Sequence, residues 1–219
     1  MRFAALIANF ALAGATLAST ASDEAPAAST APVPAGAYTI DKSHTSLIFL
    51  VSHLGFSTYT GRFTRIDAQL HFDPRNIPAS RLNVNIDPRS IEADNAPSGF
   101  IDALAGKDWL DAERFPAMSF VSQSIERTGA ETFRIRGELT MRGVTKPLAL
   151  NARYNGGYAG HPLDPNARIG FSAIGALKRS DFGVSYGIPV PGTTFGVGDE
   201  VEIVIETEFS GPPLASASR

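Results

Sequence analysis

Apolar and polar residues alternate with a period of two in eight stretches of this chain, and no amphipathic helix of comparable length interrupts them after the N-terminus. Successive side chains of a β-strand point to opposite faces, so each stretch predicts a strand with one apolar and one polar face. Most connections are short, as between antiparallel neighbours, and we expect a hairpin at Arg142-Gly143. The pattern predicts an all-β, eight-stranded antiparallel barrel. The predicted strands are residues 44–54, 61–73, 81–87, 116–125, 132–141, 146–155, 168–178 and 200–209.

One of the two long connections, residues 88–114, predicts the only helix of the barrel domain. Phe100 and Leu104 are four residues apart, a spacing that places two side chains on one face of a helix. We expect a short helix here, capped at its N-terminus by Asn95 or Ser98.

The other long connection, residues 180–199, contains five glycines, two prolines and three aromatic residues. Such a loop either covers a binding site or fills the barrel end with its aromatic side chains, and the sequence leaves both possibilities open. Its segment 183–187 matches the G-x-S-x-G nucleophile pattern. That pattern requires a following helix and a downstream histidine, whereas prolines follow it here and the last histidine precedes it. We therefore predict no esterase.

The N-terminus predicts export. Arg2 precedes the apolar stretch 3–17, and small residues follow at 18–21, which is the order found in a signal peptide. An Ala-, Pro-, Ser- and Thr-rich linker comes next. The predicted organisation is a signal peptide at 1–21, a disordered linker at 22–37, a barrel domain at 38–210 and a flexible tail at 211–219, with the mature protein in the periplasm.

Composition excludes several classes of partner. The formal net charge is −3 and the basic residues are scattered, which disfavours nucleic acid as a partner. The chain has no cysteine, so it forms no disulfide and carries no lipid on an N-terminal cysteine. Charged residues occupy the polar faces of the strands, and we expect no stable membrane insertion.

The histidines do not form a metal site by their spacing. His44 and His53 are nine residues apart on one predicted strand, or roughly 30 Å, and cannot share an ion. We expect Asp41, Lys42 and His44 to fasten the start of the barrel through local hydrogen bonds. The sequence predicts no catalytic residue, no metal and no cofactor.

Four residues are candidates for the polar end of a ligand at a barrel mouth. His53 shares the inward parity of Phe49 and Val51, and the other three lie where the seventh strand meets the second long loop. Each also has an ordinary structural role: His53 as a hydrogen-bonded histidine, and the acidic and basic residues of the loop as an ion pair. The four candidates are His53, Arg179, Asp181 and Tyr186.

Several motifs in fixed order resemble one known family. They are Tyr38–Ser46 (YTIDKSHTS), Trp109–Pro116 (WLDAERFP) and, most specifically, Gly137–Pro147 (GELTMRGVTKP). Across most of residues 38–209 the chain resembles the YceI-like periplasmic proteins. The resemblance implies a lipocalin-like barrel that binds a polyisoprenoid or another long-chain amphiphile, without established catalysis.

We therefore expect an exported binding protein that holds a long-chain isoprenoid or acyl lipid inside the barrel, with a homodimer possible. One alternative is a quinone-handling redox accessory, or an enzyme, that presents an isoprenoid head group near His53. Another is a packed barrel with no cavity that acts through its surface. The residues predicted to line the cavity are Phe49, Val51, Phe63, Phe72, Val84, Phe120, Ile135, Phe171 and Ile203.

Overall fold

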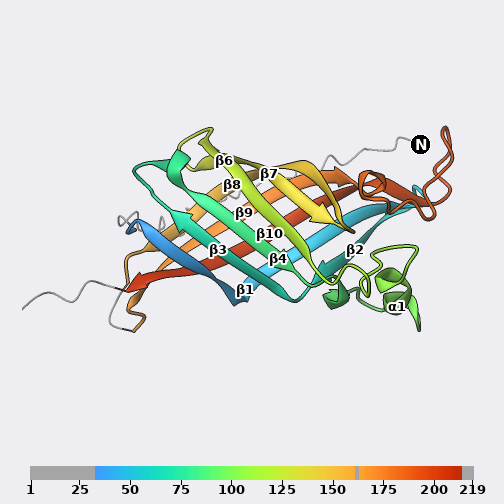
Figure 1. The fold of residues 1–219 in the computed structure, drawn as a ribbon, viewed down its shortest axis with the longest axis horizontal. Helices are drawn as coiled ribbons and strands as arrows, with labels where there is room; N and C mark the ends of the chain where they lie inside the picture. The colour runs from blue at the N-terminus through green and yellow to red at the C-terminus, as the bar shows by residue number, and fades with distance from the viewer. Residues whose placement is uncertain (1–32, 161–162, 214–219) are drawn as a thin grey trace, which may run out of the picture.

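Eight antiparallel strands close into one barrel in the computed structural model, which describes residues 33–160 and 163–213 (Figure 1). Each strand of the wall pairs with the next, and the last pairs with the first, which confirms the predicted fold class. In order around the wall, the strands are β1 (Gly36–His53), β3 (Ile66–Phe72), β4 (Arg81–Ile86), β6 (Met118–Arg127), β7 (Thr132–Met141), β8 (Val144–Tyr158), β9 (Asn166–Lys178) and β10 (Val197–Pro213).

Two shorter strands extend the wall at one end. The N-terminal part of β1 pairs with β3, whereas its C-terminal part pairs with β2 (Ser57–Phe63). In turn β2 pairs with β5 (Ile91–Glu92). The strand predicted at 61–73 is therefore two strands. Phe63 and Ile66 both face the interior although they are three residues apart, and a period of two cannot continue through that spacing.

The barrel also includes residues that the sequence assigned elsewhere. Its first strand begins at Gly36, which pairs with Phe72, and its last ends at Pro213, which pairs with Asn166. Gly36 and Ala37 of the predicted linker and 211–213 of the predicted tail are thus in strands. The predicted signal peptide, 1–21, lies outside the described residues.

The predicted helix is present, with a different cap. Helix α1 (Phe100–Ala105) lies at one end of the barrel, near β2 (Figure 1). Its N-cap is Gly99 in the left-handed region (φ 77°), and no side chain caps it, so the predicted caps Asn95 and Ser98 are wrong. A positive φ is strained for residues with a β-carbon, which explains a glycine at this position. None of the described helices is long and apolar enough to cross a membrane.

The second long loop begins with a short 3-10 turn (Arg179–Phe182) and leaves two of its aromatic residues outside the barrel. Phe182 is 2% exposed and joins the core, while Tyr186 and Phe195 are 60% and 82% exposed. None of the three lines the cavity described below. One of the three aromatic residues, Phe182, thus packs into the core at this end of the barrel, whereas Tyr186 and Phe195 do not.

Candidate ligand-binding cavity

The barrel encloses a cavity of about 550 Å³, a volume typical of small-ligand sites. Side chains from every strand of the wall line it, and most of them are aliphatic or aromatic because the inward positions of each strand are the apolar ones. Among the described lining residues, the side chains with a polar group are Thr45, His53, Tyr59, Ser80, Trp109, Arg179 and Thr207.

All nine residues predicted to form the wall line this cavity. The register between β1 and β2 shows why the apolar alternation identified them correctly. Phe49 pairs with Gly61 and Val51 with Tyr59, and paired residues of antiparallel strands share a face. Their position is confirmed. That these nine side chains bind a ligand stays a prediction.

One end of the cavity is closed by a cluster of aromatic rings centred on Phe171. The Phe171 ring centroid lies 6.0 Å from that of Phe72, 5.6 Å from that of Tyr154 and 6.4 Å from that of Phe209. Tyr38 packs edge-on against Phe72, and burial raises the pKa of its phenol to about 12. We call these five residues the aromatic cluster.

The opposite end is covered by chain outside the strands. Pro97, Phe100 and Leu104, from α1 and the residues before it, line the cavity there together with Trp109. The guanidinium of Arg179 lies 5.0 Å from the centre of the Trp109 ring, within range of a cation–π contact. This covered end and the aromatic cluster define the two ends of the cavity.

Arg179 fastens the second long loop at the covered end. Its guanidinium donates four hydrogen bonds of 2.8–3.0 Å to the backbone carbonyls of Val184, Tyr186, Val197 and Gly198. The side chain is 4% exposed, and this burial lowers the pKa of Arg179 from its ordinary value. Four carbonyls of the loop and the start of β10 thus converge on one guanidinium, which fixes the course of the loop.

The predicted pairing of Arg179 with Asp181 is wrong. The acidic residue beside the arginine is Asp199, which accepts hydrogen bonds from the backbone and hydroxyl of Ser180. The 3-10 turn leaves Asp181 exposed, and neither Asp181 nor Tyr186 lines the cavity. His53 does line it, as an exposed residue at the end of β1, which is its predicted place at a mouth.

Of the polar cavity residues, only His53 and Arg179 were among the predicted site residues, and the most informative of those missed is Tyr59. Its hydroxyl is buried and has no hydrogen-bond partner among the described residues. The predicted strand began at residue 61 and so excluded it. Extending the alternation of Phe63 and Gly61 backwards by one step reaches Tyr59, so the signal was present in the sequence.

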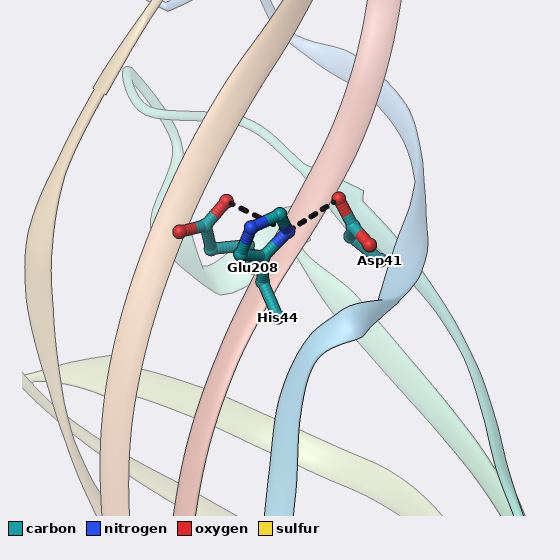
Figure 2. Close-up of side chains that lie close together, drawn as sticks. All are labelled: Asp41, His44 and Glu208. Atoms are coloured by element: carbon teal, nitrogen blue, oxygen red, sulfur yellow. Dashed lines mark hydrogen bonds and ion pairs between the residues drawn. The ribbon is translucent and has the colours of Figure 1, made fainter.

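Three polar side chains meet outside the cavity, where β1 and β10 change register. His44 Nδ1 lies 3.0 Å from Asp41 Oδ2 and 4.0 Å from Glu208 Oε2 (Figure 2). Between Asp41 and Ser46, β1 bulges away from its regular pairing with β10. Asp41 also accepts hydrogen bonds from Ser43, so the predicted local fastening is confirmed for Asp41 and His44. Lys42 instead forms an ion pair with Asp67 on β3.

A cation does not suit this group, although two carboxylates and an imidazole are common metal ligands. Arg168 Nη1 already lies 2.5 Å from Asp41 Oδ2 and 3.4 Å from Glu208 Oε2, so a guanidinium bridges the carboxylates. Hydrogen bonds from Ser43, Arg168 and His44 hold the pKa of Asp41 far below its ordinary value. The arrangement is an ion-pair group that joins β1, β9 and β10.

A closed antiparallel barrel around an apolar cavity defines the class of lipocalin-like barrels. Within that class, the chain belongs to the YceI-like family, since the model of the YceI-like domain matches residues 38–209. A UPF0312 protein of Vibrio cholerae is 35% identical over 149 residues, which cover 67% of this chain and 77% of the relative.

Solved structures share the fold. The crystal structure of Burkholderia cenocepacia BcnA, at 26% identity, aligns with a TM-score of 0.65 over 77% of this chain and 98% of that one. A polyisoprenoid binding domain from Saccharophagus degradans aligns with a TM-score of 0.58 over 80% of this chain and 98% of that one. At 13% identity, the second match shows likeness of fold alone.

Proposed function

We propose that this protein is an exported, periplasmic binding protein that carries one long-chain lipid, a polyisoprenoid or an acyl chain, inside the barrel. The observation that carries the proposal is the cavity of about 550 Å³ with walls of mostly apolar side chains. Each buried CH2 group contributes about 0.8 kcal/mol, so ten such groups contribute roughly 8 kcal/mol before the cost of association. A chain binds such a wall without directional contacts.

Relatives and the N-terminus support the two parts of this proposal separately. The shared fold with a polyisoprenoid binding domain supports a chain-shaped ligand, and the signal-peptide pattern at 1–21 supports export. We propose binding rather than catalysis, because apolar contacts hold a chain without transforming it. The most direct test is whether a lipid accompanies the natural protein.

Native mass spectrometry of protein purified from its own host makes this test. We expect a mass excess that disappears on extraction with organic solvent. A clean apoprotein mass under gentle conditions, with no uptake of added polyprenol or fatty acid, would contradict the proposal.

Two valine variants make the test specific to the cavity. Val84 lines the cavity from β4, whereas Val121 on β6 is 49% exposed on the outside. A tryptophan at the inward position fills the space where the chain would lie. We expect Val84→Trp to lower the bound fraction and Val121→Trp to leave it unchanged, in preparations compared at equal folded fraction.

A further inference from the structure

The hydroxyl of Tyr59 is a buried polar group for which the described residues supply no partner. Buried hydroxyls are nearly always hydrogen-bonded, because leaving one unpaired in an apolar environment is costly. The neighbouring hydroxyls show the ordinary situation: Thr45 bonds to Thr207 at 2.9 Å, and Ser80 accepts from the backbone of Asp73 at 3.0 Å. Among the hydroxyls of the cavity wall, that of Tyr59 is the exception.

Tyr59 is part of the cavity wall. It pairs with Val51, and both residues line the cavity. Its ring packs edge-on against Phe100 of α1, with the ring centroids 5.7 Å apart. The hydroxyl therefore belongs to the covered end, opposite the aromatic cluster around Phe171.

The charges around the cavity restrict what the hydroxyl can meet. Of the two lining residues that can carry a positive charge, Arg179 already donates to four backbone carbonyls, and His53 is exposed at the mouth. An anionic head group needs cationic partners to offset its loss of water. A neutral acceptor needs only one donor, which Tyr59 supplies.

We propose that Tyr59 is the head-group site of this protein: its hydroxyl donates a hydrogen bond to a neutral acceptor, such as a carbonyl oxygen, at the end of the apolar chain. The chain then extends from the covered end toward the aromatic cluster. This inference rests on the proposed carrier function and adds the orientation of the ligand and the chemical class of its polar end.

Three probes with a farnesyl chain separate the hydrogen bond of the head group from the apolar contacts of the chain. They are farnesylacetone, which has a ketone, the hydrocarbon of equal length, and farnesyl phosphate. Their dissociation constants are measured on delipidated protein by displacement of a fluorescent apolar dye. We expect the natural protein to bind the ketone more tightly than the phosphate. Tyr59→Phe should weaken ketone binding about three- to tenfold and leave hydrocarbon binding unchanged, since it removes one hydrogen bond and no apolar surface.

Two controls keep the result interpretable. Tyr158→Phe removes a phenol that donates to Asp164 outside the cavity, and it should change none of the three constants. Without ligand, Tyr59→Phe should melt at a temperature no lower than the natural protein, because the lost hydroxyl had no partner in the part of the chain that the structure describes.

Each contrary result has a distinct meaning. Equal weakening of ketone and hydrocarbon by Tyr59→Phe would show that the tyrosine acts by packing, and would overturn the head-group site. Phosphate binding as tight as ketone binding would overturn the preference for a neutral group. If the natural protein binds none of the probes, the carrier function itself fails.

Discussion

At the scale of single residues, polar side chains bind backbone carbonyls and acidic side chains where the barrel departs from regular strand pairing. Arg179 supplies donors to four carbonyls of the loop before β10, and Arg168 bridges acidic residues beside the bulge in β1. Both positions join segments far apart in the sequence. Both arginines thereby fix the geometry of the wall.

The acid sensitivity of the barrel should depend on Asp41. Because folding lowers the pKa of this carboxyl, its stabilising effect is complete above its ordinary pKa of about 3.9 and is lost as the pH falls below that value. We expect Asp41→Asn to lower the free energy of unfolding by about 1–2 kcal/mol at pH 7. The difference from the natural protein should shrink as the pH falls from about 5 to about 2, measured by urea unfolding.

Asp87 provides the matched control. Hydrogen bonds from Arg89 and Arg65 also lower the pKa of Asp87. Asp87→Asn should therefore also lower the free energy of unfolding at pH 7, and its difference from the natural protein should shrink over the same pH range. Only Asp41→Asn should speed hydrogen exchange in β1 around residues 41–46. A difference from the natural protein that stays constant across this pH range would show that the Asp41 carboxylate is not the source.

At the scale of the strands, glycines make room for large inward side chains. Gly61 on β2 pairs with Phe49 on β1, and a β-carbon at Gly61 would lie 2.3 Å from Phe49 Cζ. On β7, a β-carbon at Gly137 would lie 2.6 Å from Phe120 Cζ. Each phenyl ring covers a neighbouring glycine, which leaves more of the interior free.

Gly61→Ala tests this arrangement. The added methyl must displace the Phe49 ring, and we expect a loss of about 1–3 kcal/mol in stability together with weaker binding of long chains. The double variant Gly61→Ala/Phe49→Leu should recover part of the stability and part of the binding, measured by thermal unfolding and by dye displacement. Recovery is partial because the added β-carbon still lies 3.0 Å from the backbone oxygen of Glu92. Gly170→Ala is the control, because its β-carbon would meet no atom closer than 3.8 Å. Failure of the double variant to recover would refute this explanation.

The strands also show how far periodicity predicts structure. The hairpin at Arg142-Gly143 is confirmed, with positive φ at both residues and Met141 paired with Val144. The alternation is interrupted where β1 bulges, so the predicted strand began only within the bulge, at residue 44. The strand in fact begins eight residues earlier, at Gly36. A bulge inserts residues without partners, so the parity on its two sides no longer agrees.

At the scale of the whole molecule, the two ends of the barrel differ. The aromatic cluster, whose five residues all lie on strands, marks one end, while α1 and the loop held by Arg179 cover the other. In the proposed carrier, the aromatic cluster would be the floor for a ligand chain, and α1 with the loop held by Arg179 would be its cover. The floor should limit the length of chain that fits.

Phe171→Ala removes the centre of the floor. We expect it to cost about 3 kcal/mol in the free energy of unfolding, because the remaining rings refill the space only partly. It should also shift the optimum to longer chains in a series of polyprenols followed by native mass spectrometry. Ile174→Ala, on the outer face of the same strand, should leave the length optimum unchanged. An unchanged optimum in Phe171→Ala would mean that another part of the wall sets the limit.

The sequence by itself determined the barrel and the composition of its wall, because a side-chain period of two is a local property of extended backbone. All nine predicted wall residues, from Phe49 to Ile203, line the cavity for this reason. Only the tertiary structure decided which polar groups have partners. Arg179 donates to four carbonyls of residues 184–198, and Tyr59 has a buried hydroxyl with no partner among the described residues. Partners across a barrel depend on closure and register rather than on neighbours in sequence.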